Sequence, residues 1–414
     1  MADSEKIRKI ATLPSLPWEG KFVVLGVTGS IAAYKSAEIL RRIQDMGAQI
    51  QVVMTRSGAK IMSPDTLQRL SGRKVMIDLF EENQEWQIGH IALSDRADAF
   101  LIAPATANTL AKMAHGIADD LLSSTLLATR KPVVAAPAMN DGMWENPATQ
   151  TNLSVLKDRG ISIVTPAEGY LACGRIGTGR LAETPDILSA LGEALQPRKD
   201  YAGKKLLISA GPTREYIDPV RFISNPSSGK MGYAIAREAR ERGAEVILVS
   251  GPVNLRPPYG VQTLPVQTSD EMAQALMKHY PQADMVIMTA AVSDFKALSP
   301  SKQKIKKSES TLELKLTPAL DILKEMGKQK SHQILVGFAA ETQNLETYAR
   351  QKMKEKNLDY MVANDVSQPG LGFGSDQNTV LLLGKHQKEP ESMGPLPKWA
   401  IAKAILDRFS GDVA

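Results

Sequence analysis

The sequence predicts two consecutive α/β domains, each built on a mainly parallel sheet. Twice in the chain a Gly-Lys pair leads into a short apolar run, at residues 22–25 and 205–210, and each run ends in a glycine-containing turn. Apolar runs of this length are typical of strands buried on both faces of a parallel sheet. Such a turn, placed before a helix N-terminus, can receive a phosphate group. We therefore expect two ligand sites, one in each domain.

The first half of the chain alternates strand-like and helical segments. Residues 30–46 have helical periodicity, and Gly47 is a common helix terminator. Further elements are expected as strands at 49–54, 100–103 and 133–136, and as a helix at about 185–195. The last two strands end in proline-containing loops, 103–108 and 136–140, where ligands of parallel sheets bind. Residues 165–183 are rich in glycine and show no periodicity.

The second half repeats this alternation. Its expected elements are strands at 205–209, 246–250, 285–289 and 334–338, helices at 229–242, 271–279 and 345–356, and a late hairpin that includes 379–383. Residues 294–316 are polar and lysine-rich, which suits either a solvated loop or a mobile cover over an anionic ligand. The predicted organisation is a tail at 1–19, a domain at 20–195, a linker at 196–202 and a domain at 203–414.

Composition narrows the class of protein. The 414 residues are 43% hydrophobic and 23% charged, as in ordinary globular proteins. No apolar core of a signal peptide occurs in 1–20, so we expect a cytoplasmic protein that does not bind membranes. A single cysteine excludes an internal disulfide and a cysteine-rich zinc site. The net charge of +5 suits anionic small substrates, and the lysine run at 302–307 lacks the aromatic residues typical of nucleic-acid binding.

Two glycine motifs lack the residue patterns of common nucleotide-binding sites, which weakens the case for a dinucleotide site or a kinase-type P-loop. The turn at 26–30 lacks the G-x-G-x-x-G pattern of dinucleotide-binding proteins. The segment 228–232 is not a P-loop, because Met231 stands where Ser or Thr should follow the lysine.

Three polar residues are candidates for chemistry in the first half. His90 stands alone before an apolar stretch and can be structural or functional. Asn140 follows a strand end, where it can cap a turn or bind a carboxylate. Cys173 lies in a glycine-rich loop that offers little core, which favours a functional thiol over a buried one.

Together these segments resemble a known enzyme family over about residues 20–390. The first half resembles phosphopantothenoylcysteine decarboxylase, a homo-oligomeric flavoprotein, through GVTGSIAAYKS (26–36), HIALS (90–94), APATANT (103–109), PAMNDGMWENP (137–147) and LACGRIGTGR (171–180). The second half resembles phosphopantothenate–cysteine ligase through GPTREYIDPVRFISNPSSGKMG (211–232), TAAVSDF (289–295), KIKK (304–307) and GFAAET (337–342). Their order matches the bacterial bifunctional enzymes of coenzyme A biosynthesis, which implies two Rossmann-like domains.

For the first half, the resemblance implies FMN-dependent decarboxylation of 4′-phosphopantothenoylcysteine to 4′-phosphopantetheine. His90 would act in oxidation of the substrate thiol, Asn140 would hold the carboxylate, and Cys173 would return a proton. Simple loss of CO₂ would leave an unstabilised carbanion, whereas flavin oxidation of the thiol provides an electron sink. The FMN would contact loop residues at the strand ends: Gly29, Ser30, Ala103, Pro104, Ala105, Thr106 and Asn108.

For the second half, the resemblance implies ligation of 4′-phosphopantothenate to cysteine through an acyl-cytidylate made from CTP, with Mg²⁺ on the triphosphate. Asn225 would handle the acyl-cytidylate, and Arg221 and Lys304 would be needed for activity. Nucleotide-binding positions are expected at Thr289, Ala290, Ala291, Asp294, Lys304, Asp321, Ile322, Phe338, Lys352 and Lys356. Ser293 and Phe295 depart mildly from the family pattern.

The residues alone are also compatible with other functions. Relatives of the first half include peptidyl-cysteine decarboxylases, flavin prenyltransferases and inhibitory subunits of protein phosphatases. A complete ligase half argues against the first two. The three candidate residues of the first half and the lack of an acidic tail argue against the third. The resemblance also implies a homo-oligomer, a dodecamer formed by a trimeric flavin half and a dimeric ligase half.

Overall fold

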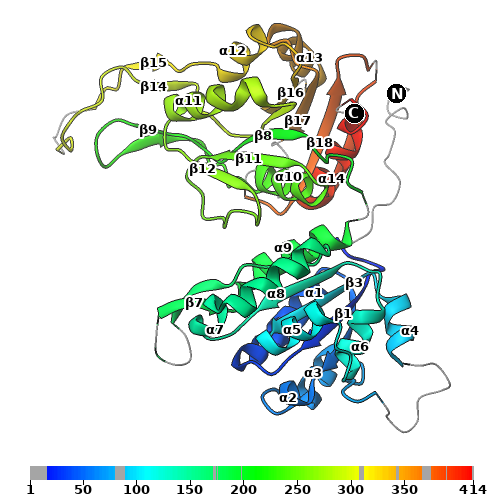
Figure 1. The fold of residues 1–414 in the computed structure, drawn as a ribbon. Helices are drawn as coiled ribbons and strands as arrows, with labels where there is room; N and C mark the ends of the chain where they lie inside the picture. The colour runs from blue at the N-terminus through cyan, green and yellow to red at the C-terminus, as the bar shows by residue number, and fades with distance from the viewer. Residues whose placement is uncertain are drawn as a thin grey trace. The chain divides into compact units, whose positions relative to one another are not determined.

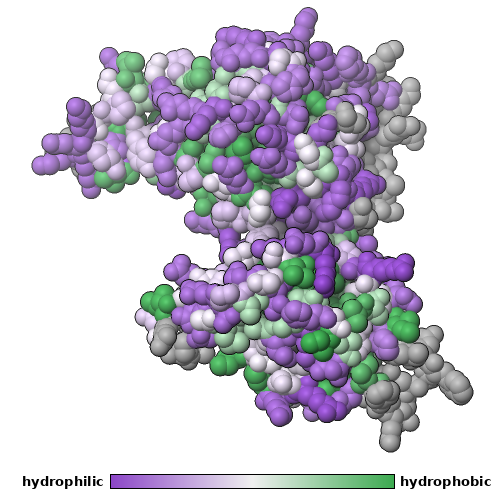
Figure 2. All heavy atoms as spheres, in the orientation of Figure 1, coloured by the Kyte–Doolittle hydropathy of each residue, from purple (hydrophilic) through white to green (hydrophobic). Residues whose placement is uncertain are grey.

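The computed structural model divides into two compact units, Pro14–Pro197 and Arg198–Ala414, each with its own sheet (Figure 1). The structure describes residues 16–79, 89–170, 174, 176–196, 198–306, 312–341, 345–365, 374–387 and 389–412. On the face drawn in Figure 2, polar residues predominate and apolar ones form small scattered groups. Within the described residues, no helix is both long and apolar enough to span a membrane.

The first unit contains a parallel five-stranded sheet in the order β2-β1-β3-β4-β5. Its strands are β1 (Phe22–Val27), β2 (Gln49–Met54), β3 (Ala99–Ala105), β4 (Val133–Pro137) and β5 (Ser162–Ile163). The first four were predicted from their apolar runs, and β1, β3 and β4 are fully buried. The strand order reverses between β1 and β3, and the crevice beyond the carboxyl ends at such a reversal is where α/β sheets bind ligands.

Helices cover both faces of this sheet. One face packs against α4 (Gly89–Arg96), α5 (Ala107–His115), α6 (Leu121–Ala128) and α8 (Pro147–Asp158). The remaining helical segments are η1 (Ile31–Lys35), α1 (Ser36–Asp45), α2 (Arg56–Ala59), α3 (Pro64–Ser71), α7 (Asp141–Glu145) and α9 (Thr184–Leu195), of which α1 packs on α3 and α9. The helix expected over 30–46 therefore begins with a separate 3₁₀ turn, capped by the Ser30 hydroxyl.

The glycine-rich segment without periodicity contains an unpredicted antiparallel hairpin, β6 (Ala167–Tyr170) with β7 (Ile176–Arg180). This hairpin is held by a backbone hydrogen bond to the loop after β4 rather than by an apolar face, since Met139 N donates to Gly179 O at 2.9 Å. Gly179 has φ +147°, and a Cβ there would lie 2.4 Å from Met139 O. Position 179 must therefore be glycine for the two backbones to come this close, and such a requirement leaves no trace in the periodicity of the sequence.

The second unit contains an eight-stranded sheet in the order β12-β11-β8-β13-β16-β17-β18-β19. Its strands are β8 (Lys205–Ala210), β11 (Glu245–Ser250), β12 (Gln262–Pro265), β13 (Met285–Met288), β16 (Ile334–Glu341), β17 (Tyr360–Asp365), β18 (Gln377–Gly384) and β19 (Glu391–Pro397). The first six are parallel, and β17, β18 and β19 pair antiparallel. The predicted late hairpin is thus confirmed as β18 with β19.

Two layers of helices enclose this sheet. Helices α10 (Lys230–Glu241) and α14 (Lys398–Phe409) share one core, whereas α11 (Ser269–His279), α12 (Ile322–Lys328) and α13 (Leu345–Glu355) pack on the other face. A short 3₁₀ turn, η2 (Tyr280–Gln282), follows α11. Two small hairpins lie outside the sheet: β9 (Arg214–Tyr216) with β10 (Phe222–Ser224), and β14 (Phe295–Ala297) with β15 (Leu316–Pro318). They extend from the left of this unit in Figure 1.

A buried arginine ties the start of the second unit to its helices. The Arg242 side chain is 1% exposed and donates to Asp200 Oδ1 and Asp407 Oδ1, both at 2.9 Å. Its guanidinium lies 5.0 Å from the ring centroid of Tyr201, whose hydroxyl donates to Leu406 O at 2.7 Å. Residues 198–202, expected within a linker, are therefore anchored in the second unit.

Candidate active sites

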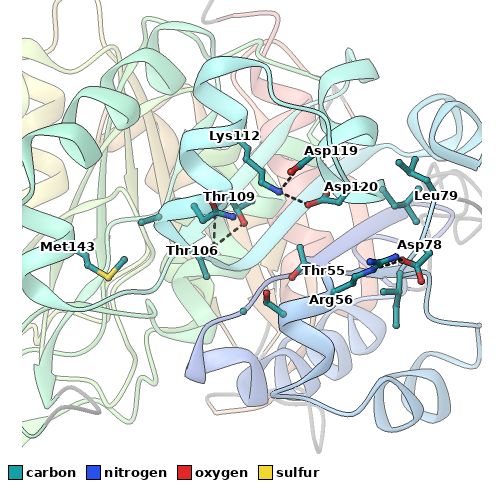
Figure 3. Close-up of a pocket in the computed structure, with 16 residues that line it drawn as sticks. Thr55, Arg56, Asp78, Leu79, Thr106, Thr109, Lys112, Asp119, Asp120 and Met143 are labelled. Atoms are coloured by element: carbon teal, nitrogen blue, oxygen red, sulfur yellow. Dashed lines mark hydrogen bonds and ion pairs between the residues drawn. The ribbon is translucent and has the colours of Figure 1, made fainter.

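A cleft of about 720 Å³ lies at the carboxyl ends of β1, β2 and β3 (Figure 3). Gly29 contributes from the loop after β1, Thr106 from the N-cap of α5 directly after β3, and Asn108 from the first turn of α5. The cleft also includes Thr55 and Ser57, which sequence analysis missed. They follow the predicted strand at 49–54, so the same carboxyl-end rule could have found them.

Buried hydroxyl groups fix the two principal loops of this cleft to each other. Thr28 Oγ1 donates to Pro104 O at 2.7 Å and accepts from Thr106 N at 3.0 Å. Ser36 Oγ donates to Ala103 O at 2.8 Å. Ala103, Pro104 and Ala105 are buried, so they set the path of the backbone, whereas Thr106 caps α5 at the cleft.

The floor of the cleft requires a residue without a side chain at position 29. A Cβ on Gly29 would lie 2.5 Å from Ser57 Cβ. The loops after β1 and β2 can therefore approach each other this closely because Gly29 lacks that atom. The N-terminus of the nine-residue helix α5 begins at the same cleft and offers backbone N–H groups to an anion.

Two ion-pair groups also line the cleft, one formed by Lys112 of α5 and one by Arg56 of α2, and neither was predicted (Figure 3). Lys112 Nζ donates to Asp119 Oδ1 at 2.5 Å and to Asp120 Oδ2 at 2.9 Å, and Arg56 pairs with Asp78 at 2.8 Å. Burial lowers the pKa of Lys112, but its hydrogen bonds to Asp119 and Asp120 raise the pKa by more than burial lowers it, so the net shift is upward. Burial raises the pKa of Asp120, and the bonds from Ser123 and Lys112 outweigh this and lower it. Lys112 and Asp120 are therefore both charged at neutral pH.

A second cavity of about 610 Å³ brings together Ser30 and Asn140. Asn140 Oδ1 accepts from Gly142 N at 2.9 Å and caps α7, so the capping role considered from sequence is present. Tyr34 and Tyr170 also line this cavity and are 61% and 75% exposed. The cavity therefore combines a polar amide with a broad exposed aromatic rim.

The structure separates the remaining candidates of the first unit. His90 lies on α4, where its carbonyl accepts from Ser94 Oγ at 2.8 Å, and it lines neither cavity. Cys173 lies outside the described residues. Neither of these two cavities therefore contains both His90 and Asn140.

In the second unit, a pocket of about 130 Å³ lies beside the N-terminus of α10. Four predicted nucleotide positions line it: Thr289, Ala290, Ala291 and Phe338. Lys230 and Lys398 also line it and were not predicted. Burial, followed by the charge of Lys230, lowers the pKa of Lys398. This end of the sheet thus presents cations, helix N–H groups and one aromatic ring.

Asn225 connects the β9–β10 hairpin to this pocket. Its Nδ2 donates to Ala291 O and to Val292 O, each at 3.2 Å. The Ser224 hydroxyl donates to Thr213 O at 2.7 Å, and Thr213 Oγ1 accepts from Ser293 N at 3.0 Å. The position of Asn225 is therefore set by the predicted nucleotide loop itself.

The other predicted ligase residues lie outside this pocket. Lys304 and Asp294 are exposed, and Ile322 is buried at the start of α12. Asp321 caps α12 and pairs with Lys356 Nζ at 2.8 Å, while Lys352 lies on α13. The described residues include no cluster of three or more His, Cys, Asp or Glu side chains that could hold a metal ion.

Comparison with known proteins identifies the family of both units. The family model "Flavoprotein" matches residues 14–196, and the model "DNA/pantothenate metabolism flavoprotein C-terminal domain" matches residues 201–411. The chain is 47% identical to the Coenzyme A biosynthesis bifunctional protein CoaBC of Bacillus subtilis, over 90% of this chain and 93% of that protein. It is 46% identical to the protein of the same name from Escherichia coli, over 88% and 91%.

Solved structures resemble each unit separately. The C-terminal domain of a Coenzyme A biosynthesis bifunctional protein CoaBC is 43% identical, with 51% of this chain and 97% of that chain covered and a TM-score of 0.44. A PPC decarboxylase mutant complexed with pantothenoylaminoethenethiol is 32% identical, with 41% and 96% covered and a TM-score of 0.38. From its matches to full-length relatives, the chain belongs to the family of bifunctional coenzyme A biosynthesis proteins, which join a flavoprotein decarboxylase domain to a ligase domain.

Proposed function

We propose that the second unit joins 4′-phosphopantothenate to cysteine at the expense of CTP, and that the first unit decarboxylates the product to 4′-phosphopantetheine. Family membership over 90% of the chain is the observation that carries this proposal. The two separate strand-end pockets support it, because the two reactions need different ligands. We place the decarboxylase in residues 20–195, the ligase in 203–414 and the enzyme in the cytoplasm.

The cleft of the first unit suits FMN. Its volume of about 720 Å³ lies within the range of cofactor pockets. Gly29, Thr55, Thr106 and Asn108 would hold the cofactor, with phosphate favoured by the N-terminus of α5. FMN supplies reversible oxidation of the substrate thiol, which makes loss of the neighbouring carboxylate possible.

The protein groups for decarboxylation are His90, Asn140 and Cys173. Asn140 lines a cavity beside Ser30, where its amide can orient the substrate carboxylate. His90 would orient or deprotonate the thiol, and Cys173 would return a proton. Because His90 lines neither of the two described cavities whereas Asn140 lines one of them, we propose that copies of the chain complete the site together. The exposed Tyr34 and Tyr170 beside Asn140 suit such an interface, in a homo-oligomer of trimeric flavin halves.

In the ligase, CTP would occupy the strand-end pocket with Mg²⁺ on its triphosphate. Thr289, Ala290, Ala291 and Phe338 would contact the nucleotide. Asp294, Lys304, Asp321, Ile322, Lys352 and Lys356 would complete the nucleotide site. Attack by the phosphopantothenate carboxylate on the α-phosphate of CTP gives the acyl-cytidylate and pyrophosphate. The amine of cysteine then displaces CMP, with Asn225 at the acyl-cytidylate and Arg221 also required for activity.

Exposed apolar residues on both small hairpins support dimerisation of the ligase halves. The side chains of Val220, Phe222, Phe295 and Leu316 are between 41% and 55% exposed. We propose that another copy of the chain covers these side chains, because large exposed apolar patches mark protein interfaces. Together with trimeric flavin halves, paired ligase halves give the proposed dodecamer.

Gly29→Ala should weaken FMN binding by about tenfold or more, or ~1.4 kcal/mol. The added methyl group must push the loop after β1 away from Ser57, and both loops line the cleft. Flavin absorbance per chain and its recovery with added FMN provide the measurement. Wild-type protein should be yellow and should decarboxylate supplied 4′-phosphopantothenoylcysteine without nucleotide. A control is Gly411→Ala, where no atom lies within 4 Å of the new Cβ. Full flavin retention by Gly29→Ala, or a colourless folded wild type, would contradict the assigned cleft.

Lys304→Gln should slow acyl-cytidylate formation about 10²- to 10³-fold, as expected for removal of a charge that stabilises the transition state. The matched control is Lys302→Gln, which removes another exposed charge two residues away. Release of pyrophosphate from CTP measures activation, and decarboxylation of supplied intermediate measures the other unit. If both lysine variants lose the same activity in acyl-cytidylate formation, the positive charge of the whole lysine run matters and Lys304 has no specific role.

A further inference from the structure

A buried aspartate lies at the tip of the β9–β10 hairpin. The side chain of Asp218 is 0% exposed. Its Oδ1 accepts from Val220 N and from Arg221 N, both at 2.8 Å. These two bonds close the turn at Asp218-Pro219, a common use of aspartate before proline. One carboxylate oxygen of Asp218 thus accepts two hydrogen bonds from within the hairpin.

The second oxygen of this carboxylate faces a different segment of the chain. Asp218 Oδ2 accepts from Ile305 N at 3.1 Å and lies 3.6 Å from Arg221 Nε. Arg221 Nη2 in turn donates to the carbonyl of Ile305. A further bond joins Ser301 N to Ile217 O at 2.9 Å. Residues 301–305 are therefore fastened to the hairpin tip.

These contacts link two residues of the proposed ligase chemistry. Lys304 directly precedes Ile305, and both bonding groups of the Ile305 backbone are taken by Asp218 and Arg221. The Lys304 side chain remains exposed. Burial raises the pKa of Asp218, but N–H bonds from Val220, Arg221 and Ile305 outweigh burial and lower it. The carboxylate is therefore ionised at neutral pH and is a strong acceptor for all of these donors.

We infer that Asp218 is a positioning residue of the ligase, which fixes the Arg221 guanidinium and the Lys304 backbone in one arrangement before substrates bind. The inference rests on the proposed ligase function. Anionic substrates then meet two cations whose anchors are already ordered, so less of the binding energy is lost in arranging them. Asp218 itself does not have to touch the substrates.

Asp218→Asn separates the two roles of the carboxylate. The amide oxygen can still accept from Val220 N and Arg221 N, so the turn is preserved. The amide nitrogen replaces Oδ2 and cannot accept from Ile305 N or Arg221. We expect kcat/KM for CTP in ligation to fall about 10- to 100-fold, whereas decarboxylation of supplied intermediate stays unchanged. The matched control is Asp284→Asn, since Asp284 Oδ2 also accepts a backbone N–H from another segment, that of Lys205 at 2.7 Å.

The decisive readout is a mutant cycle that combines Asp218→Asn with the pair Arg221→Gln and Lys304→Gln. If Asp218 acts by placing these two cations, adding Asp218→Asn to the pair should cost little further activity. Light scattering should give wild-type mass for every variant. Multiplicative losses, unchanged kinetics in Asp218→Asn, or dissociation of the oligomer would each overturn the inference. A wild-type enzyme that fails to ligate would instead overturn the proposed function, so the two failures are distinguishable.

Discussion

Asn225→Asp should still consume CTP to activate phosphopantothenate, yet it should form the amide about 10²- to 10³-fold more slowly than the wild-type enzyme. The Asn225 amide donates to the carbonyls of Ala291 and Val292 in the nucleotide loop. A carboxylate has no proton to donate to them and repels both carbonyl oxygens. It also places a negative charge beside the phosphate of the acyl-cytidylate, which opposes the approach of cysteine.

Mass spectrometry of the quenched reaction measures this effect, since acyl-cytidylate should accumulate while release of CMP declines. Asn225→Leu provides the control, because it removes the amide without adding charge. If only loss of the amide donor matters, amide formation should slow equally in both variants. If the added charge also matters, amide formation should be slower in Asn225→Asp than in Asn225→Leu. Wild-type rates of amide synthesis would contradict the role of Asn225. Failure of Asn225→Asp to consume CTP would contradict the division into two steps.

Arg242→Met should destabilise the second unit by about 3–5 kcal/mol, the usual cost of removing one partner from a buried ion-pair network. Methionine fills part of the volume, but Asp200 and Asp407 lose the guanidinium that they share. Thermal loss of ligase activity measures the change, with flavin absorbance reporting on the first unit. Arg237→Met is the matched control, because Arg237 is exposed on α10, the helix that Arg242 caps at its C-terminus. Equal stability of both variants would show that this network contributes little.

The same network predicts a pH dependence. The hydrogen bond and charge of Arg242 outweigh burial and hold the pKa of Asp200 below its usual value. A carboxyl group with a lowered folded-state pKa stabilises the fold above its unfolded pKa, near 3.9. That contribution is lost as the pH falls through the lower folded-state value. Wild-type stability should therefore fall more steeply than that of Arg242→Met in this acidic range.

Local patterns were sufficient to predict the sheet strands around which both sites form. The runs at β1, β3, β4, β8 and β13 are apolar because both faces of each strand are covered, so the sequence itself carries that signal. The β6–β7 hairpin was missed because it is held by a contact with the loop after β4. Lys112 and Asp218 were missed for a related reason, since their roles depend on partners that only the folded chain supplies. Family resemblance singled out Asn225 and Lys304 as candidate residues, which periodicity could not.

The central claim is that one chain carries both successive reactions in two separate sites. The most direct measurement supplies the full-length wild-type enzyme with 4′-phosphopantothenate, carboxyl-labelled cysteine, CTP and Mg²⁺, and follows CMP and labelled CO₂ together. We expect both products in equal final amounts, with CMP appearing first and neither product formed when CTP is omitted. Supplied 4′-phosphopantothenoylcysteine should release CO₂ without CTP. Labelled CO₂ formed from cysteine without CMP, or CMP formed with no CO₂ by flavin-loaded enzyme, would contradict the account.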